Sequence, residues 1–143
     1  MVFIGRDDDV GAVQWWLGAE NTTARTMFVL VNSAGTGTTN VLSGMNLDLG
    51  SWHHIVVVRN YVSGLNVLYV DGMEDVSSLV DYSDGDFSSD ATIDIGAFNY
   101  DGTPGQYPAS AIIDEVAIYN RALSELEIYE HYDKGLIGIG YCE

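Results

Sequence analysis

Trp52–Arg59 reads Trp-His-His-Ile-Val-Val-Val-Arg, and Leu68–Gly72 continues after a short loop with Leu-Tyr-Val-Asp-Gly. A β-branched run, a loop that carries Gly64 and a second apolar segment closed by Asp-Gly are typical of an antiparallel hairpin. The four consecutive apolar residues Ile55–Val58 predict a strand that is covered on both faces. Trp52 is expected to plug the entrance to this strand rather than to contact a ligand.

Short apolar segments recur between Gly- and Asx-rich turns along the whole chain. They predict strands at Val2–Gly5, Ala12–Gly18, Thr26–Asn32, Asn40–Ser43, His54–Asn60, Asn66–Asp71, Ala91–Gly96 and Ala111–Tyr119. This spacing is typical of an all-β sandwich or barrel. In the segment 91–96, alternation places Ile93 and Ile95 on one half-buried face. With 143 residues and no internal boundary, the chain is expected to form a single domain over residues 1–143.

One helix is predicted near the end of the chain. Ser124 and Glu127 have the spacing of a capping box, and Gly135 is a suitable C-terminal stop, so the helix is expected over residues 125–134. The remaining tail, residues 135–143, is apolar and alternating. It is expected to be either an edge strand or an element docked on a neighbour.

The composition limits the classes of partner. With 5 basic and 21 acidic residues the formal charge is −16, which opposes binding to nucleic acid and to anionic membranes. No apolar stretch approaches the roughly 20 residues of a membrane span, and the first residues lack the pattern of a signal peptide. If the protein acts outside a cell, its export signal is expected elsewhere. The single cysteine, Cys142, forms no intramolecular disulfide.

The ordered set of motifs resembles laminin-G-like, or concanavalin A-like, jelly-roll domains. The motifs are the Trp52–Gly72 hairpin, Ile93–Gly96, and Ile113–Ser124, which runs through Asn-Arg-Ala-Leu-Ser into the helix. Together they span about residues 50–134. The resemblance implies an all-β fold, an antiparallel two-sheet β-sandwich with one short C-terminal helix. It also implies an extracellular, cell-surface or virion location, because such domains are often attached to surface proteins and glycan-acting enzymes.

The resemblance has one departure, at the start of the sequence. Domains of this family usually carry further strands before the segment that corresponds to Met1–Gly5, and this sequence lacks them. A sheet without these strands exposes an edge that can pair with another chain. We therefore expect either a homo-oligomer or a partner chain that completes the sheet.

Asp114 is the candidate metal ligand. Strand alternation would place it on the same face as the apolar Val116 and Ile118, where a carboxylate needs hydrogen-bond donors, a cationic partner or a metal ion. Two alternatives are open, namely hydrogen bonds from a neighbouring loop and a calcium ion held by oxygen ligands. The resemblance implies calcium near this strand, and it carries over to Asp114 alone.

The sequence contains no recognisable set of catalytic residues. Glycoside hydrolysis needs two carboxylates across one cleft, and no strand here carries the alternating acidic pattern of related glucanases. Neither a nucleophile elbow nor a phosphate loop is present. His53 and His54 adjoin in a strand and face opposite ways, so this dipeptide alone cannot grip one zinc ion. We predict that the chain is not an enzyme.

The candidate ligand-binding residues form an aromatic and polar loop: Asn99, Tyr100, Asp101, Gln106 and Tyr107. Sugar rings stack on aromatic side chains while their hydroxyls bond to Asp, Asn and Gln, although such tyrosines can also simply pack a loop onto the sandwich. The sequence thus predicts a non-catalytic module that binds a carbohydrate or a surface protein. The alternative is a structural subunit of a virion or surface filament.

Overall fold

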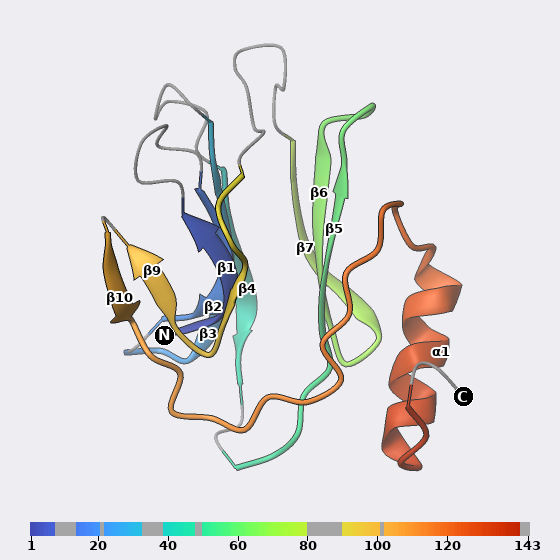
Figure 1. Ribbon diagram of the computed structural model, residues 1–143. Helices are drawn as coiled ribbons and strands as arrows, with labels where there is room; N and C mark the ends of the chain where they lie inside the picture. Colours follow the sequence, from blue (N-terminus) through green and yellow to red (C-terminus); the bar gives the residue numbers. More distant parts are fainter. Residues whose placement is uncertain are drawn as a thin grey trace.

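The computed structural model describes residues 1–7, 14–20, 22–32, 39–47, 50–79, 90–100 and 102–140 (Figure 1). Its secondary structure is mostly β. The elements are β1 (Val2–Asp7), β2 (Gln14–Ala19), β3 (Arg25–Val31), β4 (Thr39–Asn46), β5 (Ile55–Asn60), β6 (Leu65–Val70), β7 (Met73–Leu79), β8 (Asp94–Ile95), β9 (Phe98–Tyr100), β10 (Thr103–Gln106) and α1 (Glu125–Leu136).

Two antiparallel sheets face each other. One has the strand order β4-β3-β2-β1-β8 and the other has the order β5-β6-β7 (Figure 1). The sheets meet where β7 lies beside β4, and there the amide of Gly44 donates a hydrogen bond to the carboxylate of Asp75 over 3.1 Å. The two-stranded β9–β10 hairpin lies outside the larger sheet, next to β1. The predicted fold class, an all-β antiparallel sandwich with one short C-terminal helix, is confirmed.

The predicted hairpin is present with the expected turn chemistry. β5 pairs with β6 from Ile55 opposite Val70 to Asn60 opposite Leu65. β6 then returns into β7 through Asp71 and Gly72, whose φ angles are +52° and +78°. Two consecutive positive φ angles are what a tight two-residue hairpin turn requires, and Asp-Gly is a preferred pair for it.

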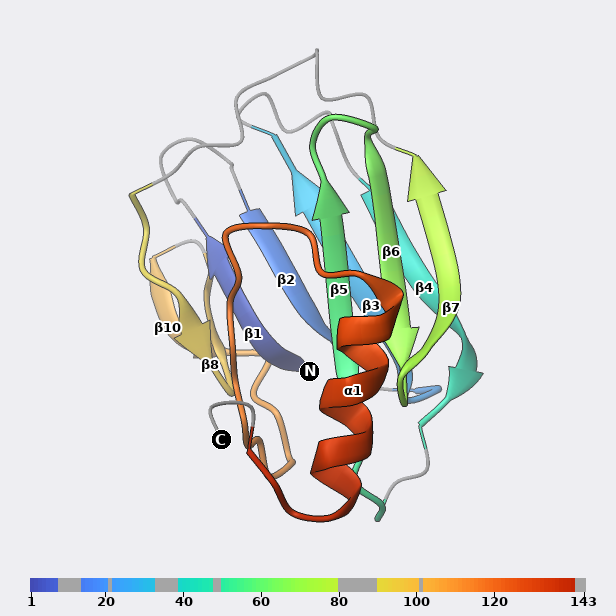
Figure 2. The ribbon, with the colours of Figure 1, turned by 90° about the vertical axis from the view of Figure 1, so that its right-hand side faces the viewer.

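The smaller sheet is covered on both faces, as the run Ile55–Val58 predicted. On the inner face, Leu68 packs in a core with side chains of the larger sheet, among them Phe28, Leu30 and Val41. On the outer face, Val67 and Tyr69 pack against Ile128 of α1, which is fully buried. Figure 2 shows α1 lying across the outer face of β5 and β6. The helix therefore forms a third layer outside the smaller sheet.

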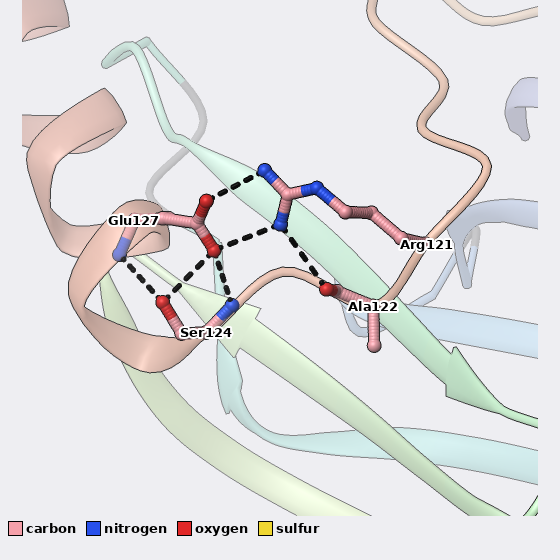
Figure 3. Close-up of polar contacts among 4 residues, drawn as sticks. All are labelled: Arg121, Ala122, Ser124 and Glu127. Atoms are coloured by element: carbon pink, nitrogen blue, oxygen red, sulfur yellow. Dashed lines mark hydrogen bonds and ion pairs between the residues drawn. The ribbon is translucent and has the colours of Figure 1, made fainter.

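The cap of α1 matches the predicted capping box. The amide of Glu127 donates to Oγ of Ser124, and the amide of Ser124 donates to the carboxylate of Glu127 over 2.8 Å (Figure 3). Arg121 adds two hydrogen bonds to the same carboxylate, of 2.6 and 3.0 Å. Because this network fixes the first turn, the helix begins at residue 125 as predicted, and it extends through Leu136, two residues beyond the predicted end.

Two sequence predictions are wrong. The segment Ala111–Tyr119 forms no strand, and Asp114, Val116 and Ile118 are all exposed rather than gathered on a buried face. The predicted strand Ala91–Gly96 shrinks to Asp94–Ile95, with Ile93 and Ile95 exposed, because it pairs with β1 over two positions only. Of the two alternatives for the apolar tail, an edge strand is absent from its described residues 137–140, and docking on a neighbour stays a prediction.

Trp52 was expected to cover the entrance to the strand that begins at Ile55. Instead 69% of its surface is exposed, so it does not fill a buried position. No helix within the described ranges has the length and apolar character needed to cross a membrane.

Candidate functional site

The β9–β10 hairpin brings together four of the five predicted ligand-binding residues. Asn99 and Tyr100 lie on β9, Gln106 ends β10, and Tyr107 follows directly. The fifth, Asp101, lies outside the described residues. The hairpin pairs Thr103 with Tyr100 and Gln106 with Phe98, so its ends hold the two tyrosines near each other.

The two tyrosines form an exposed aromatic pair on a buried base. The rings of Tyr100 and Tyr107 meet edge to face, with centroids 5.9 Å apart and planes inclined by 77°. Tyr100 also stacks on Phe98, which is only 2% exposed, at 6.2 Å. The tyrosines themselves are 41% and 52% exposed. The site therefore exposes the rings of both tyrosines to solvent, and buried Phe98 supports Tyr100 from beneath.

Hydrogen bonds fix the hairpin to the larger sheet. The amide of Val2 donates to the carbonyl of Tyr107 over 2.9 Å, and the amide of Asn99 donates to the carboxylate of Asp94, also over 2.9 Å. Tyr107 adopts a φ of +51°, a conformation that non-glycine residues seldom adopt and that these contacts must maintain. The aromatic pair is thus held in place rather than carried on a free loop.

Room for the buried base comes from Gly5 on β1. A Cβ atom at Gly5 would lie 2.7 Å from Cβ of Trp16 and 3.0 Å from the ring of Phe98. Because glycine has no side chain, Phe98 can approach the strand closely. No local sequence pattern indicates this contact, because Gly5 is only the last residue of a predicted strand.

The polar members of the site are half-buried. Asn99 and Gln106 are both partly covered, and Oδ1 of Asn99 has no hydrogen-bond partner among the described residues. Buried acceptors are usually satisfied, so a partnerless one beside an aromatic pair is unusual. The hairpin thus combines stacking surface with amide groups that can donate and accept hydrogen bonds.

Asp114, the predicted metal ligand, lies seven residues after Tyr107, on the exposed segment that follows the hairpin. Its carboxylate accepts a hydrogen bond from the amide of Glu115 over 2.9 Å. Within the described ranges, no group of three or more His, Cys, Asp or Glu side chains is close enough to hold a metal ion. Calcium takes six to eight oxygen ligands, which include backbone carbonyls as well as carboxylates. Calcium remains a prediction.

Sequence reasoning missed a histidine cluster between β5 and α1. Nδ1 of His53 lies 2.9 Å from the carboxylate of Asp71, which also accepts a hydrogen bond from the amide of His54. The ring of His54 stacks on Tyr132 of the helix. Burial lowers the pKa of His54, and the nearby His131 lowers it further. His53 and His54 precede β5 rather than lying in a strand as predicted, and their partners come from distant segments that local patterns do not indicate.

Comparisons with known proteins agree with this architecture. A laminin G family model, described as the concanavalin A-like lectin/glucanases superfamily, matches residues 1–129. The chain belongs to this superfamily. Its members include, by that description, both sugar-binding lectins and sugar-cleaving glucanases.

Among solved structures, the chain is similar to an S-layer domain-containing protein from Clostridium thermocellum, with 22% sequence identity and a TM-score of 0.45. The match covers 92% of this chain, which spans 64% of the length of that one. A search of curated proteins finds no significant match.

Proposed function

We propose that this member of the superfamily is a non-catalytic recognition domain that binds carbohydrate through its β9–β10 hairpin. The observation that carries the proposal is the Tyr100–Tyr107 pair, two exposed rings at 5.9 Å supported by buried Phe98. Sugar rings present C–H faces that pack on aromatic rings, while flanking amides bond to hydroxyls. Asn99 and Gln106 supply such amides.

The charge of the chain favours a neutral or cationic ligand. At −16 it repels anionic polymers, so uncharged glycans fit better than sulfated or phosphorylated ones. A location at a cell or virion surface accords with the resemblance to domains of surface proteins.

A glycan array tests this proposal. The wild-type chain is expected to be retained by one or more neutral glycans, and Tyr107→Ala is expected to lose most of that retention. Tyr61→Ala is the matched control, because Tyr61 is a tyrosine 66% exposed, against 52% for Tyr107, and lies on the β5–β6 turn, outside the β9–β10 hairpin. If the array does not retain the wild-type chain, or if it retains Tyr107→Ala and Tyr61→Ala equally, the β9–β10 hairpin is not the binding site.

A second function, that of a structural subunit, is favoured by one specific observation. Large apolar side chains after β10 and at the end of α1 are exposed, among them Ile112, Ile118, Leu136 and Ile137. Where exposed apolar side chains adjoin on a surface, they are typical of protein contact sites. Light scattering distinguishes the two functions. A structural subunit is expected to assemble into oligomers, whereas a monomeric mass together with retention of glycans on the array supports the first proposal.

A further inference from the structure

Helix α1 docks on the sandwich through one face and leaves the opposite face uncovered. Ile128 is fully buried against β6, and His131 and Tyr132 are half-buried on the same side of the helix. Figure 1 shows α1 outside the smaller sheet, and Figure 2 views the molecule from that side, with no described segment in front of the helix. The far face of α1 is therefore open to solvent.

The far face carries large apolar side chains at a regular spacing. They are 67%, 51% and 66% exposed, in the order Leu126, Tyr129 and Leu136. With Asp133 between the last two, these residues follow one another in steps of three, four and three along the helix. Side chains at such steps lie on one face, and we call this face the outer stripe. The same steps are those by which one helix packs along another.

Acidic side chains occupy the flanks and one position of the outer stripe. In the heptad pattern that the stripe defines, Leu126 and Asp133 take position a. Glu125 takes position g and Glu130 takes position e, and both are exposed. Within the part of α1 that the structure describes, neither Glu130 nor Asp133 forms an ion pair. Their charges are therefore available to a partner.

We propose that the outer stripe binds an amphipathic helix of a different polypeptide, with apolar residues at its a and d positions and lysine or arginine at its e and g positions. Apolar contacts along the stripe supply the affinity, and the basic flanks of the partner meet the two glutamates. A cation opposite Asp133 fixes the register, as a single polar residue at position a does in coiled coils. The proposal is independent of carbohydrate binding at the β9–β10 hairpin.

Charge disfavours a second copy of α1 as the occupant. Two parallel copies would set Glu125 of one against Glu130 of the other, and two antiparallel copies would set each of these residues against its own counterpart. Both arrangements bring like charges together, in chains that each carry −16. A partner with basic flanks converts the same contacts into ion pairs.

The probe is a synthetic peptide with three copies of the heptad Lys-Ile-Ala-Ala-Leu-Lys-Gln, labelled for fluorescence anisotropy and titrated with the full chain. This length is chosen because isolated helices shorter than roughly 12–15 residues are marginal in water. Binding is expected. A peptide of the same composition in scrambled order is expected not to bind, since it has no apolar face. A peptide with glutamate in place of lysine is expected not to bind, since it is repelled.

Leu126→Asp separates binding at the outer stripe from general attraction between an acidic chain and a basic peptide. The change removes an apolar contact and adds a negative charge, so binding at the stripe should weaken by about tenfold or more, whereas general attraction would increase. An aspartate in the first turn suits the helix dipole, so α1 is retained. Leu79→Asp is the matched control, because Leu79 is 75% exposed at the end of β7, and it should leave binding unchanged.

A charge exchange gives a second readout. Glu130→Lys combined with Asp133→Lys is expected to reverse the preference between the basic and the acidic peptide. The proposal is overturned if the basic peptide does not bind, if the scrambled peptide binds equally well, or if Leu126→Asp and Leu79→Asp bind alike. Light scattering that shows a dimer of the free chain, which Leu126→Asp dissociates, would assign the outer stripe to a second copy and would overturn it as well.

Discussion

The ring of His54 stacks on the ring of Tyr132, with centroids 6.2 Å apart and planes inclined by 27°. This contact joins the start of β5 to α1, next to the β6–β7 turn. There a Cβ atom at Gly72 would lie 2.9 Å from Cδ1 of Tyr132. The docking of the helix on the smaller sheet thus depends on a half-buried imidazole and on a glycine.

Stability is expected to fall as the pH drops below neutrality. Burial holds the pKa of His54 below its ordinary value of 6.5, with His131 lowering it further and Asp71 opposing. The unfolded chain therefore takes up a proton at higher pH than the folded one, so the free energy of unfolding decreases as the pH falls through 6.5. Urea unfolding at a series of pH values measures this. His54→Phe keeps the stacking and should flatten the profile as the pH falls through 6.5 and below, whereas an unchanged profile would assign the dependence to other groups.

Gly72→Ala is expected to destabilise the fold more than a comparable glycine substitution. Gly72 has a φ of +78°, and the new methyl group would collide with Tyr132. The backbone conformation alone costs an alanine about 1–2 kcal/mol, to which the collision adds. Gly138→Ala is the control, because its φ is +73° and nothing lies within 4 Å of its Cβ position. Equal losses of unfolding free energy in the two variants would show that Tyr132 does not pack against the turn.

Arg121→Gln is expected to raise the pKa of Glu127. Hydrogen bonding to Arg121 is the largest cause that holds this pKa at about 2, followed by the hydrogen bonds to Ser124 (Figure 3). The contribution of Glu127 to stability is present above its ordinary value of 4.5 and is lost as the pH falls towards 2. Carboxyl carbon shifts measured by NMR report the titration directly. A pKa that does not move in the variant would mean that Arg121 is not bound to Glu127 in solution.

Removal of calcium is expected to leave the melting temperature unchanged. The described residues give Asp114 no companion ligands, and its carboxylate already accepts a hydrogen bond from its neighbour. Thermal unfolding in excess EDTA and in millimolar calcium checks this. A melting temperature that rises with calcium, and that no longer does so in Asp114→Asn, would restore the metal site that the sequence suggested.

Local sequence signals predicted the elements whose partners are close along the chain. The hairpin from Ile55 to Val70 was predictable because β-branched residues indicate both strands and a short loop that carries Gly64 joins them. The cap of α1 was predictable because Ser124 and Glu127 satisfy each other within one turn. Each of these features needs only neighbouring residues.

Elements that depend on distant partners were not predictable. Ala111–Tyr119 has the alternation of a strand, but alternation does not show whether another strand lies beside it. The grouping of Asn99, Tyr100, Gln106 and Tyr107 was predicted from one loop, whereas its support by Phe98 against Gly5 joins residues far apart in the chain. The His54–Tyr132 contact is of the same kind.

The most direct test of the proposed function is an NMR titration of the labelled chain with the glycan that the array retains best. Amide shifts are expected to change at residues 98–100 and 102–107, and Tyr100→Ala combined with Tyr107→Ala is expected to abolish them while the rest of the spectrum stays folded. Shifts confined to other parts of the sandwich, or shifts that persist in the double variant, would contradict carbohydrate binding at this hairpin.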